Sequence, residues 1–166
     1  MNTSMPEFTE KEMLKEFKNA AQYVDDILYG RKTIAQVTKI SKEEIEDTFV
    51  KAQNALSLED YKKAALLFQA ILVVNNKDMR ALLGLAGALE GKKDFALAAT
   101  AYVAVMMANF QDPVAPFRAG HCLMNMGKKQ EAVKMFQLAQ DCDEKRCSSE
   151  KRKYIQKAKN ILKALS

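Results

Sequence analysis

The sequence has few of the residues that break helices. Only six glycines and three prolines occur among 166 residues, and there is no tryptophan. Sheet proteins need more glycine and proline for their turns, so this composition favours an all-helical fold. The three cysteines are an odd number, which excludes a complete disulfide framework and makes reduced thiols the expectation.

The sequence also shows no segment with the pattern of a membrane span or a secretory signal. No run of about 18 apolar residues occurs, so no membrane span is expected. No cationic segment leads into an apolar one at the start of the chain, so we expect no secretory signal. We therefore expect a cytoplasmic location. Basic and acidic side chains balance over residues 1–142, at 18 each. The net charge of +5 therefore comes from residues 143–166, which hold 8 basic and 3 acidic side chains.

The sequence lacks the patterns of a catalytic or cofactor site. It contains no glycine-rich phosphate loop, paired-carboxylate arrangement or nucleophile elbow. His121, the one histidine, has no evident nucleophile or orienting partner for base catalysis. Cys142 and Cys147 lack the second close pair that a zinc site needs. We therefore expect neither an enzyme nor a protein with a metal or other cofactor.

An unbroken repeat of 34 residues is present instead. Small residues that let two helices approach closely recur at this spacing, and an aromatic residue that fills the gap to the next pair recurs with them. This pattern predicts three tetratricopeptide repeats over residues 45–78, 79–112 and 113–146, within a repeat region of 41–146. The four columns are Ala52, Ala86, Gly120; Ala64, Ala98, Ala132; Phe68, Tyr102, Phe136; and Ile71, Val105, Ala139.

One further helix is expected on each side of the repeats. Within residues 1–40, a capping box at Thr9 begins a helix that Gly30 ends. Its apolar stripe is a candidate homodimer surface, formed by Met13, Phe17, Val24 and Ile27. Residues 147–166 are expected to form a basic capping helix. Because this tail has no stacking aromatics beyond Tyr154, a solvated face is favoured over nucleic-acid binding.

The first helix of each repeat should line a concave groove. Apolar side chains on such a surface have no core to fill, which suggests a bound partner segment. The alternative that the N-terminal helix or a second subunit covers them stays open. These side chains should point away from the seam between the two helices of a repeat, so their truncation should change the fold little. The candidates are Phe49, Gln53, Leu56, Leu83, Gly87, Phe117, His121 and Met124.

The order of these features resembles one protein family. A leading helix ends at Gly30, Thr33-Ile34 and Ile40-Ser41 follow, and Pro113, Pro116-Phe117 and Gly120-His121-Cys122-Leu123 open the third repeat. Over roughly residues 10–160 the chain resembles the class II chaperones of bacterial type III secretion. The resemblance implies a cytoplasmic protein that keeps apolar secreted translocators soluble and apart before export. It implies that an extended cargo segment binds in the groove and that the N-terminal region mediates self-association.

The sequence also departs from this family. Family members usually carry three aromatic residues along the first groove helix, where this chain has Phe49, Gln53 and Leu56. The family also tends to be acidic, whereas the C-terminal tail here is basic. Two other functions stay open at this point, a general scaffold that joins soluble proteins and a transcriptional co-regulator.

Overall fold

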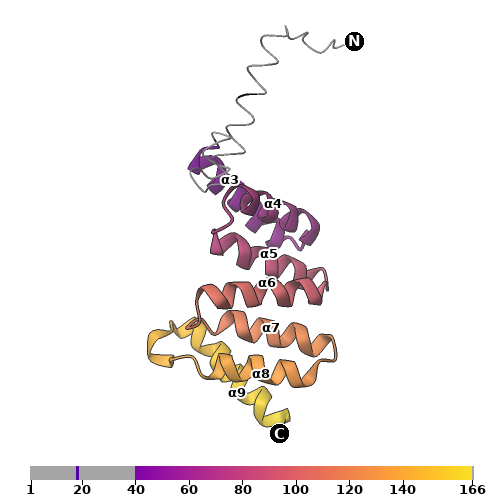
Figure 1. Cartoon of the computed structure of the whole chain (residues 1–166), viewed down its shortest axis with the longest axis vertical. Helices are drawn as coiled ribbons and strands as arrows, with labels where there is room; N and C mark the ends of the chain where they lie inside the picture. Colours follow the sequence, from indigo (N-terminus) through magenta and orange to yellow (C-terminus); the bar gives the residue numbers. More distant parts are fainter. Residues whose placement is uncertain (1–17, 19–39, 166) are drawn as a thin grey trace. The chain divides into compact units, whose positions relative to one another are not determined.

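The computed structural model describes Lys18 and residues 40–165 (Figure 1). The chain divides into two compact units, Met1–Lys42 and Glu43–Ser166. The four candidate dimer residues and the helix expected before Gly30 lie in the first unit and, apart from Lys18, outside the described residues. The described elements are α3 (Lys42–Ser57), α4 (Tyr61–Val74), α5 (Met79–Gly91), α6 (Phe95–Ala108), α7 (Val114–Asn125), α8 (Lys129–Gln140), the 3-10 turn η1 (Glu144–Arg146) and α9 (Ser149–Leu165).

The helices of the second unit form a stack of hairpins. Turns at residues 58–60, 92–94 and 126–128 join α3 to α4, α5 to α6 and α7 to α8. From α4 onward each helix packs on the next, and α5 to α8 lie in successive layers in Figure 1. The all-helical repeat fold that the sequence predicts is confirmed. Among the described helices, none has the length and apolar character needed to cross a membrane.

The repeat columns form the core of these hairpins. The alanines at 64, 98 and 132 are fully buried, and the aromatics at 68, 102 and 136 are nearly so. Close approach of the helices explains why the residues of the first column, at 52, 86 and 120, have small or no side chains. A β-carbon added to Gly120 would lie 2.8 Å from the ring of Phe136, closer than carbon atoms pack. The period of 34 therefore follows from the fit between facing helices.

The turn within each hairpin uses the same backbone geometry. Glu59, Lys93 and Gly127 have φ values of 59°, 64° and 75°, in the left-handed region. The amide of the residue after each one donates to a carbonyl five residues earlier, at 2.9 Å in all three turns. Such a left-handed residue ends a helix and satisfies its last carbonyls. Only the third turn has the glycine that favours this conformation.

The loops between hairpins repeat as well. The side-chain oxygens of Asn75, Asn109 and Asp143 accept hydrogen bonds from the backbone N–H two residues later, at 3.4, 3.2 and 2.9 Å. These three residues are 34 apart, like the core columns. The third of them follows α8, where the repeats predicted from the sequence come to an end. The loop pattern thus continues up to the start of α9.

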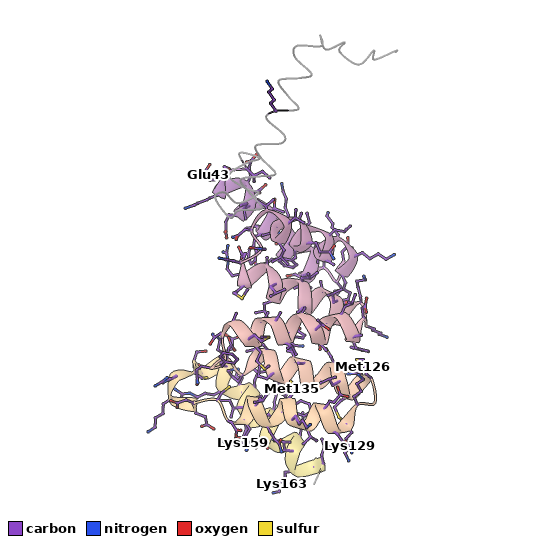
Figure 2. All side chains as sticks on the ribbon, viewed as in Figure 1. Glu43, Met126, Lys129, Met135, Lys159 and Lys163 are labelled. Carbon is purple, nitrogen blue, oxygen red and sulfur yellow. The ribbon has the colours of Figure 1, made fainter. Side chains whose placement is uncertain are left out.

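Helix α9 covers the end of the stack. Ala158 is buried in a cluster with residues of α8, and Ile155 is buried against Cys142 and Cys147 in the segment after α8, as the capping role predicted from the sequence requires. Two of its lysines form ion pairs with residues of the preceding loops, Lys151 with Asp112 at 2.6 Å and Lys159 with Glu144 at 2.5 Å. Figure 2 labels Lys129, Lys159 and Lys163 at this end of the stack. Part of the positive charge of the tail is therefore paired with acidic side chains.

Candidate binding groove

A hollow of about 490 Å³ lies along the first helices of the three hairpins. We call this hollow the groove. Three of the residues predicted from the sequence line it, Leu56, Gly87 and His121. The other lining residues are Tyr61, Glu90, Gly91, Lys93, Phe95, Tyr102, Arg118 and Asn125. The groove therefore draws on α3, α5 and α7, with contributions from the start of α4 and from α6.

Gly87 keeps the middle of the groove open. A β-carbon at this position would meet only the hydroxyl of Tyr102, at 3.9 Å. That distance is an ordinary van der Waals contact, so close helix packing does not require a glycine here. This distinguishes Gly87 from Gly120, whose missing side chain makes room for a core ring. The absence of a side chain at 87 leaves space on the groove surface.

A polar cluster around Glu90 forms part of the groove wall. The Tyr102 hydroxyl donates to Glu90 Oε2 at 2.8 Å, and Arg118 donates to both carboxylate oxygens at 3.4 Å. His121 Nδ1 lies 3.1 Å from Oε1. Burial, followed by the charge of Glu90, raises the pKa of the Tyr102 hydroxyl above its ordinary value. Burial would lower the pKa of Arg118, but Glu90 and its tyrosine neighbours hold that pKa above its usual value.

Phe49 does not line the groove, contrary to the sequence-based expectation. Its side chain is only 8% exposed and packs edge-on against Phe68, with ring centroids 5.8 Å apart. The guanidinium of Arg80 lies over the Phe49 ring, 4.5 Å from its centroid. Glu46 holds this guanidinium with two hydrogen bonds of 3.1 and 3.0 Å. Phe49 is therefore a core residue covered by a paired arginine.

Phe117 is likewise buried rather than displayed. It is 9% exposed and lies between Phe136 of α8 and Tyr154 of α9, with ring centroids 5.7 and 5.4 Å away. The expectation failed because α9 supplies an aromatic ring to this side of α7. Truncation of Phe49 or Phe117 should therefore disturb the fold, in contrast to what the sequence suggested.

The remaining predicted residues lie outside the groove lining. Gln53 is exposed on α3, and Leu83 is 37% exposed on α5. Met124 is half-buried and packs against the core cluster that contains Phe117. Sequence reasoning missed the roles of Tyr61, Tyr102 and Arg118. One feature of the sequence could have indicated the role of Tyr102. It carries a hydroxyl where the equivalent residues at 68 and 136 are phenylalanines.

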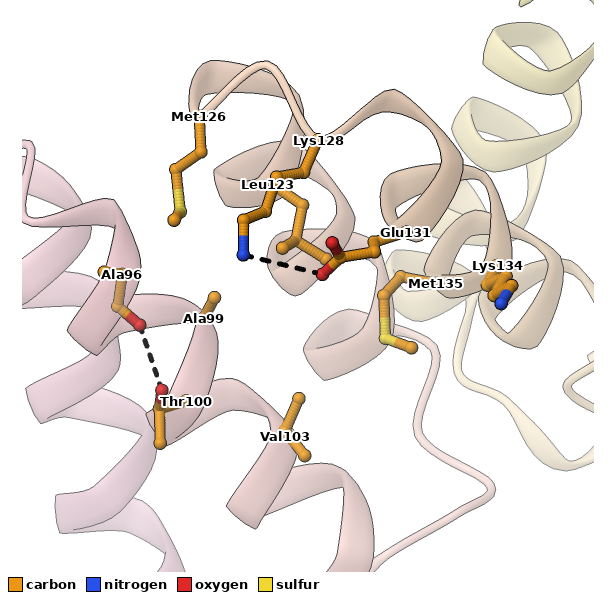
Figure 3. Close-up of a pocket in the computed structure, with 10 residues that line it drawn as sticks. All are labelled: Ala96, Ala99, Thr100, Val103, Leu123, Met126, Lys128, Glu131, Lys134 and Met135. Atoms are coloured by element: carbon orange, nitrogen blue, oxygen red, sulfur yellow. Dashed lines mark hydrogen bonds and ion pairs between the residues drawn. The ribbon is translucent and has the colours of Figure 1, made fainter.

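A second hollow of about 490 Å³ shares no residue with the groove. Figure 3 shows its walls, which come from α6 on one side and from α7, α8 and their turn on the other. The lining is mainly apolar and includes Val103, Met126 and Met135, with an ion pair of 3.8 Å between Lys128 and Glu131 at its edge. No pattern in the sequence predicted this hollow.

The three thiols are withdrawn from solvent. Cys122, Cys142 and Cys147 are all buried. Burial raises the pKa of Cys122 to about 12 and that of Cys142 to about 11, and a thiol must lose its proton to act as a nucleophile or ligand. Within the described part of the chain, no three histidine, cysteine or acidic residues are grouped as a metal site requires.

Known proteins share both the sequence and the fold. No protein-family model matches the chain. It is 32% identical over 120 residues to the low calcium response locus protein H of Yersinia pestis, covering 71% of this chain and 70% of that protein. The type III secretion translocator chaperone SycD of Yersinia enterocolitica has a TM-score of 0.70 at 28% identity, covering 80% of this chain and 98% of SycD. SycD in complex with a peptide of the translocator YopD gives 0.69 at 27% identity, covering 75% and 94%.

These likenesses confirm the family resemblance seen in the sequence. The Yersinia pestis relative matches 71% of the chain, and the SycD fold matches the stack of helices described above. The chain belongs to the class II translocator chaperones of type III secretion, a family of chaperones and not of enzymes.

Proposed function

We propose that this protein is a cytoplasmic chaperone that binds an extended segment of an apolar type III secretion translocator in the groove. Binding would keep translocators soluble and apart in the bacterial cell until export. One observation carries the proposal. The Yersinia enterocolitica relative binds a peptide of the translocator YopD, and this chain spans 94% of that protein at 27% identity.

The chemistry of the groove suits such a segment. Leu56 and Phe95 offer apolar contacts, and Gly87 leaves room for a cargo side chain. Burial of a large apolar side chain contributes about 1.5–3 kcal/mol, so a few such contacts hold a short segment. The exposed side chains of Arg118 and His121 can satisfy the polar backbone of an extended segment, which has no internal hydrogen bonds.

The test fills the groove without touching the core. Gly87→Leu places a side chain where a β-carbon meets only one atom, at 3.9 Å. The matched control is Ala104→Leu, on an exposed face of α6 away from the groove. Each variant is co-expressed with the translocators of its own secretion system, and co-purified and soluble translocator are measured. We expect Gly87→Leu to lose cargo, which becomes insoluble, and the control to keep it.

Two exposed lysines test whether cargo binds to α9 instead of the groove. Lys153 and Lys157 are exposed on α9. Neutralising both to glutamine should leave cargo binding unchanged if the groove holds the segment. Loss of cargo in this variant, with normal binding by Gly87→Leu, would contradict the groove as the site and place binding on α9.

Self-association belongs to the same proposal. The N-terminal stripe of Met13, Phe17, Val24 and Ile27 is our candidate dimer surface. In support, one structure of the SycD relative is described as an alternative dimer.

A further inference from the structure

The groove holds His121, the one histidine of the chain. Among the described residues, only one of its two ring nitrogens has a hydrogen-bond partner. His121 lies on α7 with 53% of its side chain exposed, and its Nδ1 is 3.1 Å from Glu90 Oε1 on α5. The described residues provide no hydrogen-bond partner for Nε2, the other ring nitrogen. The role of this nitrogen depends on which of the two carries the proton.

The surroundings of Glu90 determine the position of that proton. The Glu90 side chain is only 11% exposed, accepts the Tyr102 hydroxyl at 2.8 Å, and lies beside the positive charge of Arg118. A carboxylate with these partners can accept hydrogen bonds but cannot donate one. His121 Nδ1 must therefore be the donor. A neutral imidazole has a single N–H, so Nε2 is left with its lone pair.

The rest of this wall offers donors. Arg118 and Lys93 line the groove as cations, and the Asn125 amide already donates to the His121 carbonyl at 2.9 Å. Nε2 is thus an exposed acceptor among donors. A bound segment in extended conformation presents its N–H groups and carbonyls in alternation along its edges.

We propose that Nε2 of His121 accepts a hydrogen bond from one backbone N–H of the bound cargo segment and thereby sets its register in the groove. The inference rests on the proposed function. A slip by one residue would turn that N–H away and exchange the side chains that face the groove for those that face solvent. His121 is then a specificity residue that selects register, with Glu90 as its positioning residue.

The first experiment needs no ligand. Because the chain has one histidine, ¹⁵N NMR of the free protein at pH 8.5 gives a single pair of ring signals. We expect the tautomer with the proton on Nδ1. In Glu90→Gln the new amide can donate to Nδ1, so the proton should move to Nε2. A wild-type ring protonated mainly on Nε2 would overturn the inference.

The second experiment measures binding. The probes are synthetic peptides tiled over the YopD segment bound by SycD, and the tightest binder is then N-methylated at each backbone nitrogen in turn. One methylation should weaken binding to the wild type by roughly three- to tenfold, the effect of one neutral hydrogen bond. His121→Phe should show the same loss with the unmodified peptide and no further loss with the methylated one.

The control variants separate the hydrogen bond from ring shape and from the fold. His121→Gln retains an acceptor and should bind more tightly than His121→Phe, whereas Glu90→Gln should bind as weakly as His121→Phe. Binding that is equally sensitive to methylation with and without His121 would overturn this inference alone. If the wild-type protein binds neither these peptides nor the translocators of its own secretion system, the proposed function fails and the register role fails with it.

Discussion

The ring of Phe68 occupies the space that a β-carbon on Gly84 would need. An added β-carbon would lie 2.3 Å from the ring Cζ, so α4 and α5 meet through direct contact of ring and backbone. Gly84→Ala should therefore lower stability by about 1–3 kcal/mol, the usual cost of overpacking a core. Gly87→Ala is the matched control on the same helix, because its β-carbon has room, and it should be neutral or stabilising. Thermal unfolding of both variants tests this, and equal melting temperatures would contradict the contact.

The first turn should gain stability from a glycine. Glu59 is held at a φ of 59°, which costs a residue with a side chain roughly 1–2 kcal/mol. Glu59→Gly removes that cost but adds backbone entropy to the unfolded chain, so the net gain should be about 0.5–1 kcal/mol. Ala70→Gly, at an exposed site within α4, should instead lose about 1 kcal/mol. The free energy of unfolding in urea is measured for both variants. A gain at position 59 with a loss at position 70 attributes the gain to the left-handed turn, whereas a loss in both variants would contradict it.

The two buried phenylalanines should matter for stability. Phe49→Ala and Phe117→Ala each remove a ring that packs against other core aromatics, at an expected cost of about 3–5 kcal/mol. Leu83→Ala removes a side chain that is 37% exposed and should cost much less. The measurement is the free energy of unfolding in urea. Unchanged stability of the phenylalanine variants would restore them as groove residues.

Asp78 should give stability an acid dependence. It caps α5 by accepting the N–H groups of Arg80 and Ala81, at 3.0 and 3.2 Å. Burial would raise its pKa, but Arg80 and these N–H groups together hold the pKa below its ordinary value. A lowered folded-state pKa stabilises the fold above the unfolded value of about 3.9, and this stabilisation is lost as the pH falls through the folded value.

The measurement for Asp78 is unfolding free energy against pH. Asp78→Asn keeps a capping side chain without the charge. It should be less stable than the wild type at neutral pH, and the difference should shrink as the pH falls below about 4. Asp47→Asn, at an exposed ion pair with Lys51, should show little difference at any pH. A gap between wild type and Asp78→Asn that stays constant with pH would exclude the charge as the cause.

The N-terminal region should control the oligomeric state. Deletion of residues 1–29 removes the whole apolar stripe and leaves the compact unit of residues 43–166 intact. We expect a monomer in sedimentation velocity, with the full chain sedimenting as a dimer at the same concentration. Glutamate substitutions at Met13 and Phe17 should give the same monomer. A full chain that is monomeric without cargo would contradict a dimer through this stripe.

The sequence predicted the array because its signal is local and repeated. Each column records a contact between helices adjacent in the chain, so spacing alone identifies it. The residues that line the groove were harder to predict from the sequence. Phe117, for example, contacts Tyr154, which lies 37 residues later on a helix that was predicted only as a cap. Arg80 covers Phe49 only because Glu46 and Asp78 hold its guanidinium there. Such pairings depend on side-chain direction, which the repeat period does not encode.

The loop motif at Asp143 has a consequence for how this array could grow. Asp143 takes the place in the period that Asn75 and Asn109 occupy before α5 and α7, and α9 follows it as those helices follow their loops. By position in the period, α9 corresponds to the opening helix of a fourth unit. A duplicated segment of 34 residues inserted at this junction would find a ready acceptor surface on α8. The length of the groove is therefore a modular property that gene duplication could change, with the contacts of α9 to α7, such as Tyr154 with Phe117, exchanged for contacts to the inserted helices.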